Sequence, residues 1–414
     1  MIEKCESVRY NTNGMEQRRQ KLNWFTWNVD HVGVLDGIRA IAILTVLWFH
    51  FWQQTWLMPY YPAPFLAAFG IKAIDFNPIR RSGYLAVDLM ILLSGFVLFL
   101  PYARQRILGS SVDSIGTFYR KRAARILPSY VFAVLVMFFI ALLQGVYHGK
   151  PEFMWRDLGM HLTLTFMLRP DTYLFSGING VFWTVVIEVL FYAIFPFVGK
   201  LFQKWPIRTY LGMAAIGLGF TFGFALKQTD QISFLVNRFP TFLPVFANGM
   251  LGAYLYVWIA KKAPLRWLFS ICGTIMAAAA LIVILRLLQS CSASKTIQVW
   301  QLTWRYPLST AYLAFVLGLC ISAKPIRFLL SNRVFAAIAG VSYNLYLWHQ
   351  FLIVRLRMAL GCQSGADVAA LGANTQWMLN MEALVFAFAI AILTTFCMER
   401  PVYRLIMGQG PHKI

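Results

Sequence analysis

The sequence contains little charge for its length. Only 13% of the 414 residues are Asp, Glu, Lys or Arg, whereas about 25% are charged in an ordinary soluble protein. Together with 59% hydrophobic residues, this shortage excludes a disordered chain, a coiled coil and a typical soluble enzyme. The hydrophobic residues come in about ten runs, each near twenty residues long. The sequence therefore predicts an all-α fold, a bundle of about ten transmembrane helices, in a multi-pass protein of the cell membrane.

Acidic residues are scarce, with 16 Asp and Glu against 37 Lys and Arg and a formal net charge of +21. In a soluble protein such an excess would suggest nucleic acid as the partner. Here the basic residues lie in the gaps between the apolar runs, where they contact lipid headgroups and set the topology. We therefore expect membrane lipid, and no nucleic acid, to be the partner of these charges.

Cysteine is also rare, and the six cysteines form no CxxC pair and no metal-ligand spacing. We expect no metal site. Cys291 and Cys362 both fall in predicted outer loops, where a disulfide between them is conceivable, although isolated cysteines in membrane proteins usually pack as small apolar residues. The first 34 residues contain no apolar stretch that could act as a cleavable signal peptide.

The apolar runs define ten candidate membrane spans. If the N-terminus is cytoplasmic, 23 Lys and Arg residues fall on the cytoplasmic side and 13 on the other, as the positive-inside rule requires. Both termini are thus predicted to be cytoplasmic, with a segment 1–34, a membrane domain 35–405 and a tail 406–414. The candidate spans are residues 35–57, 82–102, 128–146, 181–202, 208–227, 241–260, 267–289, 306–323, 335–357 and 381–401.

Ionisable side chains within the spans are costly, about 2.5 to 3.5 kcal/mol each on insertion scales, so each one needs a partner or a function. In the first span, Arg39 and His50 are eleven residues apart, which places them on one helix face about 16 Å apart along the axis. His50, Asp88, Glu188 and His349 come from four different spans. Counted by helical rise, all four lie at nearly one level, in the outer third of the membrane. We interpret them as a polar chamber; independent structural pairs are the alternative.

A basic cluster, TFYRKRAARILP, precedes the third span. It has two interpretations: an anchor that binds anionic lipid headgroups, or a phosphate clamp in which Arg122 and Arg125 act with Arg39 at the same depth. The long outer segment 147–180 is expected to form either an interfacial helix or a re-entrant cover over a site.

These motifs resemble the integral-membrane acyltransferase 3 family, which O-acylates cell-surface sugars and other hydroxyl acceptors. The resemblance covers about residues 35–405 and rests on five motifs in the family's order: LDGIRAIAILTVLWFH, GYLAVDLMILLSGFVLF, FYRKRAARILP, WTVVIEVLFY and SYNLYLWH. The family's Arg and His pair in the first helix corresponds to Arg39 and His50. Val189 stands where many members have a second acidic residue. Because the chain stops at 414, it resembles stand-alone members without a C-terminal hydrolase-like domain.

The resemblance implies an acyl-CoA, most often acetyl-CoA, as donor substrate, with no permanently bound cofactor. The acceptor would be a hydroxyl of a glycan or of a lipid-linked molecule. A base is needed for the acceptor proton, and His50 is our candidate because imidazole titrates near neutral pH. Glu188 or Asp88 would orient the imidazole. Direct transfer and a transient acyl-histidine both remain open.

The remaining residues of the expected site fall into two groups. The donor phosphates would bind the arginines of the first helix and of the basic cluster. Other polar or aromatic residues of the motifs would support the site. The acyl-CoA-binding residues are Arg39, Arg122 and Arg125, and the supporting residues are Asp36, Trp183, Tyr346 and His349.

Two other classes of protein would use a similar composition. A proton-coupled transporter also places His and carboxylates in a water-accessible chamber, but the sequence shows no paired, Gly- or Pro-interrupted helices. A non-catalytic scaffold would use its aromatic residues only for packing and interface belts. Thioester cleavage in the presence of an acceptor would separate the acyltransferase from both alternatives.

Overall fold

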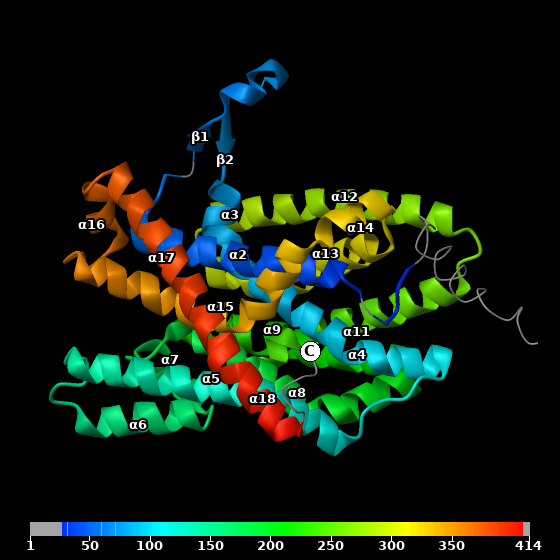
Figure 1. Cartoon of the computed structure of the whole chain (residues 1–414), viewed down its shortest axis with the longest axis horizontal. Coiled ribbons are helices and arrows are strands. Elements are labelled where there is room, and N and C mark those ends of the chain that lie inside the picture. The colour runs from blue at the N-terminus through cyan, green and yellow to red at the C-terminus, as the bar shows by residue number, and fades with distance from the viewer. Residues whose placement is uncertain (1–26, 31, 59, 71, 409–414) are drawn as a thin grey trace, which may run out of the picture.

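A computed structural model describes residues 27–408, apart from residues 31, 59 and 71. Most of the predicted N-terminal segment 1–34 and the end of the predicted tail 406–414 lie outside the described residues. The described part is a helical bundle in which most long helices run along the longest axis of the molecule, while α17 (Ala373–Thr394) crosses them obliquely (Figure 1). The predicted all-α class is confirmed.

Ten long helices form the bundle in the described part of the chain, and shorter elements connect them. The long helices are α2 (Val34–Thr55), α4 (Ala86–Leu108), α5 (Ile115–Leu143), α8 (Trp183–Lys204), α9 (Pro206–Gly223), α11 (Phe239–Lys262), α12 (Arg266–Ala293), α13 (Ile297–Ile321) and α15 (Arg333–Ala359), followed by α17 (Ala373–Thr394) with a π-helical turn (Thr395–Glu399) and α18 (Arg400–Met407). The short helices are α3 (Asn77–Ser82), α6 (Pro151–Leu162), α7 (Pro170–Leu174), α10 (Ile232–Leu235), α14 (Lys324–Leu330) and α16 (Gly365–Ala370). The strands β1 (Tyr60–Pro62) and β2 (Ala73–Asp75) pair antiparallel in an arm that projects from the bundle (Figure 1).

Every predicted span overlaps a long helix. Eight of the described helices are long and apolar enough to cross a membrane, and a ninth span results if α13 and α14, bent by 109°, are taken together. The expected number was about ten. α15 does not qualify by composition because polar residues such as Asn344, His349 and Gln350 interrupt its apolar residues.

Helices α4 and α11 form the centre of the bundle, where 78% of each apolar span is buried. Glycines allow their close contact. A Cβ atom on Gly249 would lie 2.0 Å from the Leu92 carbonyl oxygen, and one on Gly95 would lie 2.4 Å from the Phe246 carbonyl oxygen. Both positions therefore exclude any side chain, as small residues do at close helix contacts in membranes.

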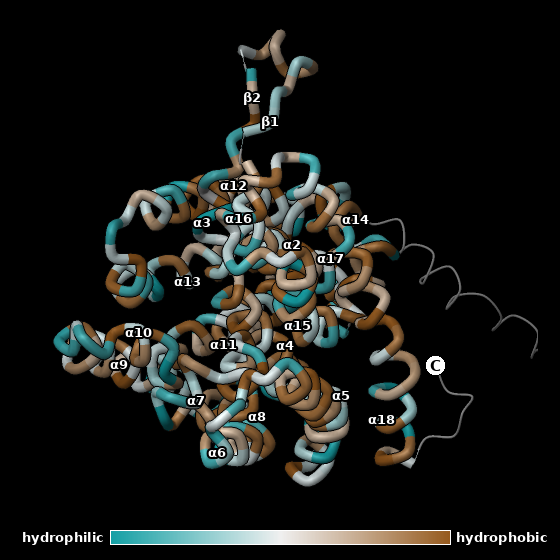
Figure 2. The backbone as a smooth tube through the Cα atoms, turned by 90° about the vertical axis from the view of Figure 1, so that its left-hand side faces the viewer, coloured by the Kyte–Doolittle hydropathy of each residue, from teal (hydrophilic) through white to brown (hydrophobic). Residues whose placement is uncertain are grey.

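Peripheral helices expose apolar side chains. Only 28% of the apolar span is buried in α12 and in α17, and Ile275, Ile282 and Val385 are each more than 60% exposed. Figure 2 looks along the helices and shows that hydrophobic residues lie on the outer surface of the bundle as well as inside it. Such a surface requires lipid around it, so the chain is an integral membrane protein.

Helix α5 begins at Ile115, thirteen residues before the predicted third span. The Ser114 side chain caps the helix by accepting a hydrogen bond from the Thr117 amide at 3.2 Å. Arg122 and Arg125 are thus part of the helix, and not of a loop before it. The prediction from apolar runs missed the first part of α5, because basic residues favour a helix but interrupt a hydrophobic run.

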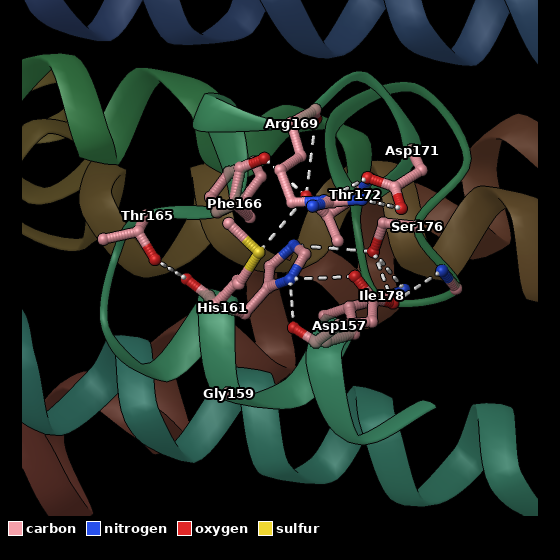
Figure 3. A network of polar contacts seen from close by, with 12 residues as sticks. Asp157, Gly159, His161, Thr165, Phe166, Arg169, Asp171, Thr172, Ser176 and Ile178 are labelled. Atoms are coloured by element: carbon pink, nitrogen blue, oxygen red, sulfur yellow. Dashed lines mark hydrogen bonds and ion pairs between the residues drawn. The ribbon is translucent and has the colours of Figure 1, made fainter. Parts of the chain in front are cut away.

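Segment 147–180 folds into α6, α7 and short turns held by a buried polar network (Figure 3). Asp157 accepts hydrogen bonds from the Tyr147 hydroxyl at 2.7 Å, the Ser176 hydroxyl at 3.0 Å and the Gly177 amide at 3.1 Å. His161, also fully buried, has its Nδ1 2.8 Å from the Asp157 carbonyl oxygen. One carboxylate therefore joins the start, the middle and the end of the segment.

Cys291 and Cys362 are both free, so the disulfide considered from the sequence does not form. The Cys291 sulfur is buried and lies 3.6 Å from the Tyr84 hydroxyl. It packs as a small, weakly polar side chain.

Candidate active site

Two cavities lie along α2, one near each end of the helix. Arg39, near the start of α2, lines the first, and His50, near its end, lines the second. We call them the arginine cavity and the histidine cavity. The arginine cavity includes Arg39, Ser94, Arg122, Arg125, Thr184, Glu188, Tyr192, Ser342 and Tyr346. The histidine cavity includes His50, Trp52, Gln53, Arg81, Tyr84, Asp88, Trp183, Asn237, Gln298, Tyr346 and Gln350.

The arginine cavity brings together all three arginines that the sequence predicted as a clamp. Arg39 comes from α2, and Arg122 and Arg125 from the first turns of α5. Together with Glu188, the only acidic residue of its described lining, they leave a formal charge of +2. The cavity has a volume of about 100 Å³. A positively charged pocket of this kind suits an anionic ligand.

Glu188 lies in the arginine cavity, and not beside His50 as expected. It accepts a hydrogen bond from the Tyr192 hydroxyl one turn along α8. The Arg122 guanidinium lies over the Tyr192 ring, 5.5 Å from its centroid. Glu188 is also an electrostatic neighbour of Arg39, as is Asp36 in the first turn of α2. Both acidic side chains therefore lie near Arg39 and interact with its charge.

His50 and His349 meet in the bundle. The Nδ1 atom of His50 lies 3.0 Å from Nε2 of His349, and both side chains are buried. His50 and His349, from the first and the ninth predicted spans, are therefore in direct contact. The prediction that a carboxylate orients the imidazole is wrong, because His349 occupies that place.

The backbone defines which nitrogen of each ring carries hydrogen. His349 Nδ1 lies 2.7 Å from the Tyr346 carbonyl oxygen, and a carbonyl can only accept, so Nδ1 donates and Nε2 has a free lone pair. His50 Nδ1 faces this lone pair and also the Val46 carbonyl oxygen at 3.0 Å, so it donates too. Neutral His50 therefore carries no hydrogen on Nε2, which makes no hydrogen bond within the described part of the chain. This is the arrangement of a base whose orientation is fixed.

Asp88 lines the histidine cavity but binds an arginine that the sequence analysis missed. Its Oδ2 lies 3.3 Å from Nε of Arg305, and the side chains of the pair are only 1% and 3% exposed. Arg305 falls just before the predicted span 306–323, so it was counted as a loop charge. It lies within α13. A lone arginine inside the apolar and aromatic stretch WQLTWRYPL was the available signal.

Two residues, Val87 and Tyr346, line both cavities. We call these two shared residues the wall, since they lie where the linings of the two cavities meet. The Tyr346 hydroxyl donates to the Val181 carbonyl oxygen at 3.2 Å, which fixes the side chain across the wall. Trp183 lines the histidine cavity and stacks on Phe242, with the ring centroids 5.7 Å apart. Three of the four expected supporting residues, Trp183, Tyr346 and His349, thus lie at or beside the histidine cavity.

Across the described residues, no group of three or more His, Cys, Asp or Glu side chains is placed to hold a metal ion. The polar groups that converge on the two cavities are guanidinium, carboxylate, imidazole and amide. They can bind phosphate, move a proton and hydrogen-bond a polyhydroxyl compound.

Comparisons with known proteins agree with this chemistry. The model of the acyltransferase 3 family, described as an acyltransferase domain, matches residues 32–399. The acyltransferase MdmB of Streptomyces mycarofaciens is 27% identical over 246 residues, which cover 59% of this chain and 56% of MdmB. Nodulation protein 10 of Rhizobium leguminosarum bv. viciae is 24% identical, with 91% of this chain and 94% of that protein covered. The O-acetyltransferase OatA of Staphylococcus aureus is 19% identical, with 90% and 56% covered.

The match thus covers little more than half of the length of MdmB and of OatA, but nearly all of nodulation protein 10. No solved structure matches the chain significantly. The family match extends over most of the chain and contains every residue of the two cavities. This chain is therefore a member of the acyltransferase 3 family of integral membrane proteins.

Proposed function

We propose that this protein transfers an acyl group, most simply acetyl, from cytoplasmic acyl-CoA to a hydroxyl of an acceptor on the other side of the cell membrane. The observation that carries the proposal is the oriented pair of His50 and His349 in a cavity that adjoins the arginine cavity. An anion-binding pocket next to a fixed base matches the needs of transfer from a coenzyme thioester.

The donor binds with its phosphates in the arginine cavity. Arg122 and Arg125 lie three residues apart on α5, so they present guanidinium groups from one helix face toward Arg39. The extended pantetheine arm then runs along α2 past Val87 and Tyr346. The axial distance from Arg39 to His50, about 16 Å, suits such an arm better than a compact donor.

The acceptor enters the histidine cavity from its open side and presents a hydroxyl to His50 Nε2. As the hydroxyl oxygen attacks the thioester carbonyl carbon, Nε2 takes the hydroxyl proton. The imidazolium that forms keeps its Nδ1–H directed at His349 Nε2, which stabilises the positive charge. Collapse of the tetrahedral intermediate breaks the carbon–sulfur bond, and the CoA thiolate leaves and recovers the proton. The acyl group remains on the acceptor as an ester.

The lining of the histidine cavity supports a polyhydroxyl acceptor such as a surface glycan. Trp52, Tyr84 and Trp183 offer aromatic rings, and the amides of Gln298 and Gln350 offer donors and acceptors. Such a mixture of flat apolar faces and amide groups suits sugar rings, which have apolar faces and hydroxyl edges.

The experiment uses purified protein in lipid nanodiscs with acetyl-CoA and an acceptor extracted from the cell envelope. CoA release is followed by a thiol reagent and ester formation by mass spectrometry. We expect His50→Ala to abolish both. Arg122→Ala/Arg125→Ala should raise KM for acetyl-CoA by about tenfold or more, since each charged hydrogen bond contributes about 1.5 to 3 kcal/mol.

Two outcomes would contradict the proposal. Full activity of His50→Ala would show that His50 is not the base. An unchanged KM for acetyl-CoA in Arg122→Ala/Arg125→Ala would show that the two arginines do not bind the donor phosphates. His161→Ala is the matched control, because this histidine is also fully buried but lies outside both cavities. Solute uptake without CoA release would indicate the transporter, although family membership favours the acyltransferase.

A further inference from the structure

Asp88 has no role in the transfer step proposed above, although it lines the histidine cavity with His50. Its Oδ2 is paired with Arg305 at 3.3 Å. Its Oδ1 makes no hydrogen bond to any described residue. A carboxyl group has several acceptor positions, so Asp88 retains acceptor capacity in the cavity that His50 also lines.

Arg305 holds Asp88 in place and balances its charge. Its Nη1 donates to the Val236 carbonyl oxygen and to the Thr241 hydroxyl, both at 2.6 Å. Its Nη2 lies 3.4 Å from Oδ1 of Asn237. The guanidinium is thus fixed to the segment that connects α10 with α11, and it cannot turn away from Asp88. Arg305 therefore keeps the carboxyl group of Asp88 in one orientation.

We infer that Oδ1 of Asp88 binds a second hydroxyl of the acceptor, next to the hydroxyl that His50 activates. The acceptor class is then a neutral diol, such as two neighbouring hydroxyls of one sugar ring. An ammonium group fits less well, because Arg305 already compensates Asp88 and Arg81 adds positive charge to the same cavity. This inference rests on the proposed function and makes Asp88 a residue for acceptor specificity.

The consequence is strong discrimination between acceptors. A site built to bind a hydroxyl rejects an analogue that lacks it, because a buried polar group is then left without a partner. A compound with one hydroxyl should therefore be a much poorer acceptor than the related diol. Donor binding should not change, because Asp88 does not line the arginine cavity.

The test measures acetyl transfer from acetyl-CoA by the full-length protein in nanodiscs to a cis vicinal cyclohexane diol, to cyclohexanol and to cis-2-aminocyclohexanol. For the wild type we expect kcat/KM for the diol to exceed that for each of the other two by about tenfold or more. Two equivalent hydroxyls alone would give only a factor of two over cyclohexanol. In Asp88→Leu, whose side chain cannot form a hydrogen bond, the preference for the diol should fall to that factor, with KM for acetyl-CoA unchanged.

Asp157→Asn is the matched control, because it also alters a buried carboxylate that binds neighbouring groups but lies outside the histidine cavity. It should keep the diol preference. If Asp88→Leu fails to fold with Arg305 uncompensated, Asp88→Leu/Arg305→Gln removes both charges and answers the same question.

Equal use of cyclohexanol and of each diol hydroxyl by the wild type would overturn the inference. So would a diol preference that survives in folded Asp88→Leu protein. The absence of CoA release with every alcohol would refute the proposed function instead, so the two failures are distinguishable.

Discussion

Replacement of His349 by phenylalanine tests the histidine pair directly. The substitution keeps a ring in the buried site but removes the lone pair that faces Nδ1 of His50 at 3.0 Å. The imidazolium formed during transfer then loses its hydrogen-bond partner, and the ring of His50 loses an orienting contact. Binding of the donor in the arginine cavity should be unaffected, since His349 does not line it.

The size of the effect follows from the kind of hydrogen bond. A hydrogen bond to a charged group contributes about 1.5 to 3 kcal/mol, and about 1.4 kcal/mol corresponds to a tenfold change in rate. We therefore expect kcat to fall by about 10- to 150-fold in His349→Phe, with KM for acetyl-CoA unchanged. His349→Gln should recover much of the rate, because its amide oxygen can occupy the position of Nε2 and accept the same hydrogen bond.

The assay is single-turnover acetyl transfer in nanodiscs, normalised to folded protein by size-exclusion chromatography. His161→Phe serves as the control, since it makes the same change at a fully buried histidine outside both cavities. An unchanged kcat in folded His349→Phe would refute the reasoning. An equal loss in His349→Phe and His349→Gln would show that His349 acts only through packing.

Three further predictions concern stability. Gly249→Val should destabilise the protein by about 1 to 3 kcal/mol or more in unfolding assays, because its Cβ would lie 2.0 Å from a backbone oxygen of α4; an unchanged unfolding midpoint would contradict the close helix contact. Arg305→Gln should cost about 3 to 5 kcal/mol by leaving Asp88 uncompensated, and Asp88→Asn/Arg305→Gln should recover part of it; equal losses in both would argue against the pair. The hydrogen bond from Arg169 holds the pKa of Asp171 below its ordinary value, so this carboxylate stabilises α7 above pH about 4 and loses that effect as the pH falls through its lowered pKa. Hydrogen exchange of the α7 amides, corrected for intrinsic rates, should therefore rise in acid, and Asp171→Asn should remove that dependence.

Much of the arrangement could be predicted because membrane helices restrict geometry. Helical rise and span order place residues by depth, and this was enough to bring His50 to His349 and Arg39 to the arginines of α5. The same reasoning located the spans, since only apolar runs of sufficient length can cross a bilayer.

The depth of a residue in the membrane does not define how its helix is rotated about its own axis, or which helices lie next to it. Glu188 faces the arginine cavity, and Asp88 faces both the histidine cavity and Arg305, yet all were counted at one level. The pairing of Asp88 depends on how α13 packs against α4, which one sequence does not define. Arg305 was missed for a related reason, because a charged residue at the edge of an apolar run looks like the end of the span.

The wall formed by Val87 and Tyr346 bears on the energy balance of the cell. A continuous aqueous path between the two cavities would let protons and other ions run down their gradients across the membrane. Val87 and Tyr346 line both cavities, so they lie where such a path would run. A smaller residue at position 87 would therefore be expected to harm a cell by dissipating its membrane potential, even if acyl transfer itself continued.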